Sequence, residues 1–125
     1  MPRGEMLEPL LTSEILLALI ENGRQGEAAA AADTSFDPLP VVKIFTPDAD
    51  ATWLLSEADP SAPDRVFGLC DLGLGEPELG WSSMKEIATV RGRLRLVVER
   101  DRHFRPTKTI GAYAKDAATA RRIVT

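Results

Sequence analysis

The sequence has little cysteine and no long apolar run. Cys70 is the one cysteine, so no intramolecular disulfide can form, and a reducing cytoplasm suits the chain best. The longest strictly apolar run is Ile15–Ile20, six residues, whereas a membrane-spanning helix needs about 20 residues. A signal peptide is not expected either, because three glutamates, Glu5, Glu8 and Glu14, precede that short run. We therefore expect a cytoplasmic protein without a membrane segment.

Several motifs typical of enzymes are also missing. The segment Gly73-Leu74-Gly75 lacks the later glycine, the lysine and the following helix start of a phosphate-binding loop. No Glu-x-Lys motif follows Pro47-Asp48, so this acidic residue is interpreted as part of an ordinary turn. Cys70 and His103, the only histidine, could act as nucleophile and base, but Cys70 lies in an apolar stretch where cysteine behaves as a small hydrophobe. The sequence predicts no cofactor and favours a protein that is not an enzyme.

The chain is long enough for one domain, and its charge is unevenly distributed. It has 125 residues, of which 44% are hydrophobic, so residues 1–125 are expected to form a single domain with one core. The net charge is −4, but residues 1–90 carry 5 Lys/Arg against 16 Asp/Glu, and residues 91–125 carry 10 against 3. Either the two parts compensate each other on folding, or the surface is bipolar, with separate acidic and basic faces for partners.

Helical spacing of apolar residues predicts a first helix over 7–23, capped by Thr12 or Ser13. The segment 23–40 is rich in alanine, glycine and proline, and is expected to be a flexible loop or linker. Because alanine has the highest helix propensity, an extension of the helix through Ala28–Ala32 is the alternative.

The remainder of the chain predicts an α+β fold. β-Branched and aromatic runs at 41–45, 51–57 and 65–72, joined by short turns, favour an antiparallel meander of three strands. Residues 73–80 are expected to be a glycine-rich loop. Capping-box spacing from Ser83 predicts a short helix that ends by Gly92. Alternating apolar residues over 94–98 predict a further strand, and helical spacing over 107–124 predicts a third helix. We expect a small antiparallel sheet of these strands, packed with three helices.

Two stretches of the sequence carry a resemblance to a known family. The first is Phe67-Gly68-Leu69 followed by Glu76-Pro77-Glu78-Leu79-Gly80, and the second is Glu99-Arg100-Asp101 with His103-Phe104. With Val42–Pro47 and Trp53 they resemble a bacterial family of unknown function, encoded on plasmids, conjugative elements and phages. The resemblance covers about residues 7–106. It implies a shared fold and an association with mobile genetic elements, and it implies no particular reaction. Arg93, Arg95 and Arg102 depart from the pattern of the family.

Alternating spacing singles out Glu99, Asp101 and His103. In an extended strand these side chains would share one face, with Arg100 and Arg102 on the other. Two carboxylates and an imidazole can hold a divalent metal, and Glu76, Glu78 or Asp71 could add a ligand from the glycine-rich loop. The alternatives are a solvated strand and a seam of salt bridges.

A basic stripe is the second candidate surface. Arg91, Arg93 and Arg95 alternate, so in a strand they would share a face. With Arg100, Arg102, Arg105 and Lys108 they could contact phosphates. The alternative is a solvated face that protects an edge strand from pairing with other chains.

These observations favour a small accessory protein of a mobile genetic element, without enzymatic activity. We expect it to bind a protein partner, or a nucleic acid, through its charged faces, and its oligomeric state is left open. The binding or loop-organising candidates are Glu76, Glu78, Glu99, Arg100, Asp101 and His103. The alternative function is that of a metal-dependent hydrolase or nuclease that uses Glu99, Asp101 and His103.

Overall fold

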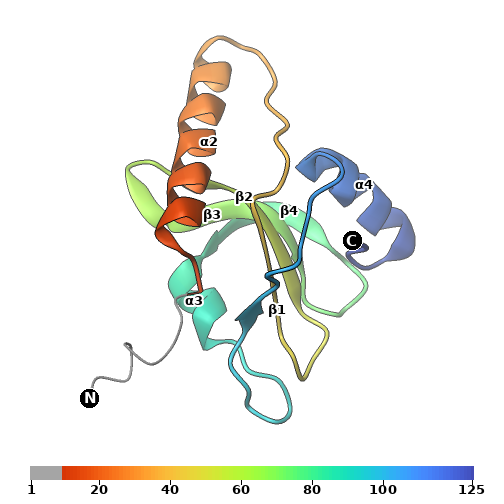
Figure 1. Cartoon of the computed structure of the whole chain (residues 1–125). Coiled ribbons are helices and arrows are strands. Elements are labelled where there is room, and N and C mark those ends of the chain that lie inside the picture. Colours follow the sequence, from red (N-terminus) through yellow and green to blue (C-terminus); the bar gives the residue numbers. More distant parts are fainter. Residues whose placement is uncertain (1–9) are drawn as a thin grey trace, which may run out of the picture.

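The computed structural model describes residues 10–125 and confirms the α+β class (Figure 1). Helix α2 spans Ser13–Ala31, α3 Met84–Thr89 and α4 Ile110–Ala120. The strands are β1 Val42–Phe45, β2 Thr52–Asp59, β3 Ala62–Asp71, β4 Glu78–Ser83 and β5 Glu99–Arg100. In the described part of the chain, no helix is both long and apolar enough to cross a membrane.

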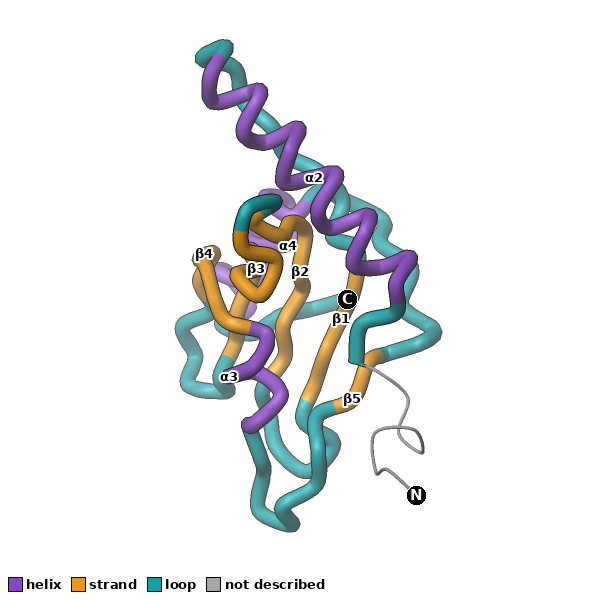
Figure 2. The backbone as a smooth tube through the Cα atoms, turned by 90° about the vertical axis from the view of Figure 1, so that its left-hand side faces the viewer, coloured by secondary structure: helices purple, strands orange, loops and turns teal. Residues whose placement is uncertain are grey.

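All five strands form one antiparallel sheet in the order β4-β3-β2-β1-β5. The first four strands are a meander, as the turn spacing predicts for the first three of them, and β5 returns to pair with β1 at the far edge (Figure 2). Strands β4 and β5 are therefore the two edges of the sheet. Residues placed on these two strands lie on opposite sides of the molecule.

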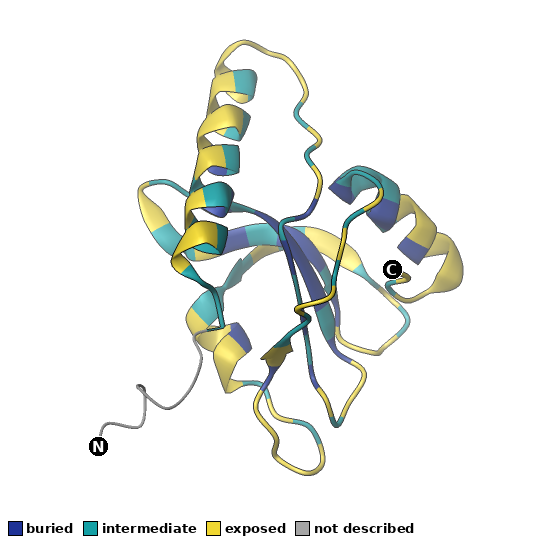
Figure 3. Cartoon of the chain, in the orientation of Figure 1, coloured by how far each residue is buried: buried dark blue, intermediate teal, exposed yellow. Residues whose placement is uncertain are grey.

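The sheet is buried on both faces, with α2 and α4 on opposite sides (Figure 1). Leu19 of α2 and Ile87 of α3 pack in one cluster with Trp53 and Leu55 of β2. Leu54, between those two strand residues, packs on the other side against residues of α4 and β3, namely Leu69, Ile110, Tyr113 and Ala117. Because successive strand residues point to opposite faces, the consecutive apolar residues 53–55 supply both clusters. Figure 3 shows buried segments in the middle of the sheet and an exposed outer side of α2.

The prediction of a linker over 23–40 is wrong for its first part, since α2 continues to Ala31. The alternative of a helix through the alanines is correct, and only 32–40 is without regular structure. Thr12 is the N-cap, and its Oγ1 accepts a hydrogen bond from the amide of Ile15 at 3.2 Å. Gly23 does not end the helix but is buried within it, where a β-carbon would lie 1.9 Å from the carbonyl oxygen of Ala58. The predicted start at residues 7–9 lies outside the described residues.

Two further assignments also need correction. The end of the predicted loop 73–80 belongs to β4, where Gly80 pairs opposite Gly68 and extends the ladder. The predicted strand over 94–98 is not formed, because Arg95 has a left-handed backbone conformation with φ of 61°. The helix predicted from Ser83 is confirmed, with the Ser83 hydroxyl accepting from the amide of Glu86.

Substituting Gly23 by alanine tests the close approach of α2 to β2. Alanine gains about 1 kcal/mol of helix propensity, but its methyl group would collide with the Ala58 carbonyl. We expect a net loss of about 1–3 kcal/mol in the free energy of unfolding, measured by urea denaturation. Gly80→Ala is the control, because no atom lies within 4 Å of a β-carbon at that position. Equal stability of the two variants would contradict the packing described here.

Candidate functional site

A groove of about 690 Å³ runs along the β5 edge of the sheet. Its apolar part comes from Phe45 of β1, Ala88 of α3, Leu10 before α2, and Val97 and Val98 before β5. Its charged part is the segment Glu99–His103, which contributes Glu99, Arg100, Asp101, Arg102 and His103. We call this the edge groove. It brings together four of the six predicted site residues.

The arrangement expected of Glu99, Asp101 and His103 is not formed. Glu99 pairs with Phe45, and the amide of Asp101 donates to the Lys43 carbonyl at 2.9 Å, so the chain is extended to that point. It then turns at 102–103, where one carboxylate oxygen of Asp101 accepts the His103 amide at 2.9 Å. The i, i+2, i+4 alignment therefore ends at Asp101. Among residues 10–125, no group of three or more His, Cys, Asp and Glu side chains is placed to hold a metal.

Arg100 and Asp101 have structural contacts within the edge groove. The Nη1 of Arg100 donates to the Leu10 carbonyl at 2.9 Å and ties the segment before α2 to β5. The second carboxylate oxygen of Asp101 lies 3.8 Å from Nζ of Lys43. Arg102 and His103 are exposed at the turn. The segment thus combines anchoring side chains with solvent-facing ones.

Glu76 and Glu78 are not part of this groove. Glu78 begins β4, opposite Cys70, at the other edge of the sheet from β5, and Glu76 is exposed in the loop before it. That loop is organised instead by buried Asp71, whose two carboxylate oxygens accept the amides of Gly73 at 2.8 Å and Ile123 at 2.9 Å. The glycine-rich loop and the Glu99–His103 segment therefore do not form one site.

Asp48, interpreted from the sequence as an ordinary turn residue, holds the loop that carries the basic stripe. Its Oδ2 accepts the amides of Leu94 at 2.6 Å and Leu96 at 3.3 Å. A β-carbon on Gly92 would lie 2.3 Å from its Oδ1, so glycine is needed for this approach. Desolvation by burial raises the pKa of Asp48, but the backbone donors outweigh it, and the net pKa lies below the ordinary value. The sequence signal for this anchoring role was an aspartate in a turn, with no hydrogen-bond partner evident among its neighbours.

The basic stripe is not a strand face, because residues 91–97 form this anchored loop, which we call the basic loop. Arg91 folds back to donate to the carbonyls of Ala88 and Val90 at 2.8 and 2.9 Å. Arg93 and Arg95 are exposed, and no hydrogen bond or ion pair within residues 10–125 involves their side chains.

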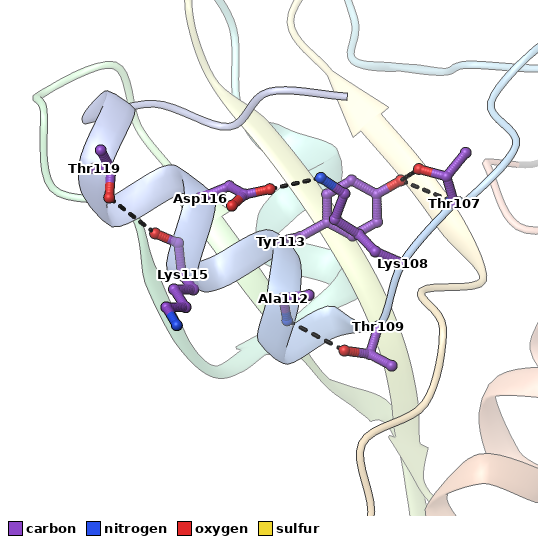
Figure 4. A network of polar contacts seen from close by, with 8 residues as sticks. All are labelled: Thr107, Lys108, Thr109, Ala112, Tyr113, Lys115, Asp116 and Thr119. Carbon is purple, nitrogen blue, oxygen red and sulfur yellow. Dashed lines mark hydrogen bonds and ion pairs between the residues drawn. The ribbon is translucent and has the colours of Figure 1, made fainter.

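Arg105 and Lys108 also belong to the stripe, and they differ in whether another side chain compensates their charge. Arg105 donates only to the backbone carbonyls of Arg102 and Phe104, which leaves its charge uncompensated. Lys108 instead binds Asp116 of α4 and lies 5.4 Å from the ring centre of Tyr113 (Figure 4). The hydrogen bond and charge of Asp116 raise the pKa of Lys108. Lys108 therefore supports α4 and does not extend the basic surface.

Cys70 has the environment of a structural cysteine. It is half-buried in β3, and burial raises the pKa of its thiol, while a hydrogen bond with Trp53 opposes the shift. The nearby charges of Asp71 and Glu78 raise this pKa further. A raised pKa keeps the thiol protonated and weakly nucleophilic.

The anchoring role of Asp48 predicts a pH-dependent effect of Asp48→Asn. Since the folded-state pKa lies below the ordinary pKa of an aspartate, the ionised carboxylate stabilises the fold above that ordinary value, and this stabilisation is lost as the pH falls through the folded pKa. The variant should be less stable at pH 7, and the difference should shrink below about pH 4. Urea denaturation at several pH values measures it.

Hydrogen exchange locates the effect of this substitution. The amides of Leu94 and Leu96 should exchange about tenfold faster in Asp48→Asn, as expected when hydrogen bonds to a charged acceptor weaken. Asp50→Asn is the control, because Asp50 is an exposed aspartate of the same turn. Equal exchange rates in both variants would argue against the anchor.

Comparison with known proteins bears on the whole described chain. No curated protein and no solved structure matches it. A family model described as "Protein of unknown function (DUF2958)" matches residues 10–124, which is nearly the complete sequence. The chain belongs to the DUF2958 family.

Proposed function

We propose that this protein is a small accessory protein of a mobile genetic element, without enzymatic activity, that binds a negatively charged partner through the basic loop and the adjoining edge groove. The association with mobile elements rests on the motifs around Phe67, Glu76 and Glu99. The partner would be an acidic segment of a protein or a nucleic-acid backbone. Both present closely spaced negative charges.

One observation carries this proposal: arginines of the basic loop are not neutralised within the described chain. No ion pair within residues 10–125 involves Arg91, Arg93 or Arg95. Hydrogen bonds to neutral carbonyls fix the Arg91 guanidinium without removing its charge. An approaching anion would therefore meet three cations on one short loop.

The loop is also held in shape before any partner arrives. Two amides are fixed on Asp48, and Arg91 closes the C-terminal end of α3. A segment that is already ordered loses less conformational entropy on binding than a free loop does. This anchoring favours the basic loop as a recognition element over a solvated connection.

Apolar side chains beside the arginines favour a protein partner. Leu94, with 74% of its surface exposed, lies between Arg93 and Arg95, and exposed Val97 leads into the edge groove. A nucleic-acid backbone offers little to these apolar groups, whereas an acidic amphipathic segment would bury them. No comparable observation favours the metal-dependent hydrolase, whose three side chains are separated by the turn at 102–103.

The salt dependence of binding tests the charge in this proposal. Fluorescence anisotropy would measure the affinity of labelled polyglutamate and of a labelled single-stranded DNA as the salt concentration rises. Arg93→Ala with Arg95→Ala removes two charges, so for the DNA the slope of log K against log salt should fall by about 1.4. The matched control is Arg24→Ala with Lys115→Ala, which removes two charges from exposed sites on α2 and α4.

A third probe, an acidic peptide that carries leucine, separates a protein partner from a nucleic acid. Stronger binding of an acidic peptide that carries leucine than of polyglutamate, lost in Leu94→Ser, supports the protein partner. Preferred binding of DNA, unaffected by Leu94→Ser, supports a nucleic acid. A slope that is the same for the wild type and both double variants would contradict a role for the basic loop.

A further inference from the structure

Helix α2 runs past the end of the sheet (Figure 1), and a second groove, independent of the proposed function, lies beside it. It has a volume of about 360 Å³ and is bounded by α2, the segment around Phe36 and the β2–β3 turn. We call it the helix groove. The lining residues used below are Gly26, Glu27, Phe36, Glu57, Asp59 and Trp81. Its size is at the small end of the range for ligand sites.

Glu57 and Trp81, which both line the helix groove, belong to a row of three side chains across three strands, with Phe67 between them. Glu57 of β2 pairs opposite Phe67 of β3, and Phe67 pairs opposite Trp81 of β4. Directly opposite residues of an antiparallel sheet share a face, and neighbouring strands are about 4.8 Å apart. A carboxylate and an indole therefore lie on the same face, about 10 Å apart at the backbone, with a phenyl ring between them.

An irregularity in β2 produces this row. The register shifts between Leu55 and Glu57, so Ser56 has no opposite residue and Glu57 takes the position facing Phe67. The side chain of Asn22 in α2 donates to the Ser56 carbonyl at 2.9 Å and fixes the irregularity to the helix. The backbone position of Glu57 is thus fixed by the fold.

Glu57 has no partner for its charge within the described chain. No hydrogen bond or ion pair among residues 10–125 involves its carboxylate, and burial raises its pKa. Gly26 makes room for it, because a β-carbon there would lie 2.7 Å from Oε1 of Glu57. Phe36 packs beside the same glycine. A partly desolvated carboxylate next to aromatic rings gains most from a cation that replaces its lost water.

At the Trp81 end of this row, the indole already contacts a cation of the same chain, Arg65. The guanidinium of Arg65 lies 4.9 Å from the ring centre of Trp81 and 3.3 Å from a carboxylate oxygen of Asp59. Phe67 contacts Trp81 edge to face, with ring centres 5.4 Å apart, and 48% of the Trp81 surface stays exposed. Asp59 is satisfied by Arg65 and Ser61, whereas Glu57 is not.

We propose that the helix groove binds an organic cation, an alkylammonium or guanidinium group, between the carboxylate of Glu57 and the indole of Trp81. Such a group occurs on lysine and arginine side chains and on free amines. Every charged side chain that lines the groove is acidic, namely Glu27, Glu57 and Asp59, so an anion is disfavoured. This acidic groove is distinct from the edge groove with its arginines.

Tryptophan fluorescence tests the proposal with butylammonium and with the blocked amino acid N-acetyl-arginine amide. Trp53 is 3% exposed, so a ligand-dependent change reports on Trp81. We expect saturable changes with both cations and none with butanol, the uncharged analogue of the first. Glu57→Gln should weaken binding at least tenfold, as expected when a charge-assisted contact is lost. Glu21→Gln, on the exposed side of α2, should bind like the wild type.

The pH dependence provides an independent measurement. Binding needs ionised Glu57, whose pKa lies above 4.5, so affinity should fall on acidification earlier than for an ordinary carboxylate. Because burial disfavours the charged form, Glu57→Gln should fold at least as well as the wild type at pH 7. If Glu57→Gln failed to fold, Trp81→Leu would take its place, and binding would be followed by the NMR chemical shift of the Glu57 amide.

The outcomes separate clearly. Binding of the arginine compound in preference to butylammonium would identify a guanidinium as the ligand, and the reverse would identify an alkylammonium, as carried by lysine or a free amine. Equal binding by the wild type and Glu57→Gln, binding of butanol as strong as that of butylammonium, or no saturable change with either cation would overturn the proposal.

Discussion

The structure depends on the burial of β2 on both of its faces. Trp53 and Leu55 point toward α2 and α3, and Leu54 points toward α4, so one strand joins two hydrophobic clusters. Each helix covers a surface that the sheet could not leave exposed to water. Because α2 must approach this strand closely, buried Gly23 lies against Ala58, and the rest of the helix extends beyond the sheet. The core thereby also determines where the helix groove forms.

Aspartates organise the loops around this core. Asp48, Asp71 and Asp101 each accept backbone amides: Asp48 and Asp71 accept at least one from a segment distant in sequence, and Asp101 accepts that of His103 in its own turn. A carboxylate that accepts N–H groups satisfies donors that irregular backbone would otherwise leave unpaired. Part of the acidic excess of residues 1–90 is therefore used inside the structure. The arginines of the basic loop have no such internal role for their charge.

This use of charge separates two surfaces. The edge groove and the basic loop lie beside β5, and the acidic helix groove lies beside the β2–β3 turn and includes Trp81 of β4. The two surfaces share no lining residue. Each surface can be altered by substitutions that leave the other unchanged.

Local chemistry in the sequence determined the fold class, the meander and the two helix starts at Thr12 and Ser83. Each of these depends on near neighbours: strand propensity, turn residues and a hydroxyl within three residues of its donor. Four of the six candidate residues line one groove because they are close together along the chain.

Only the tertiary structure decided the rest, because the deciding contacts join residues that are distant in sequence. The amides of Leu94 and Leu96 bond to Asp48, more than forty residues earlier, and this turns an alternating pattern into a loop. Pairing with β3 converts Glu78–Gly80 from loop to strand. The row from Glu57 to Trp81 exists only in the assembled sheet, since no spacing along the chain encodes which residues face each other across strands.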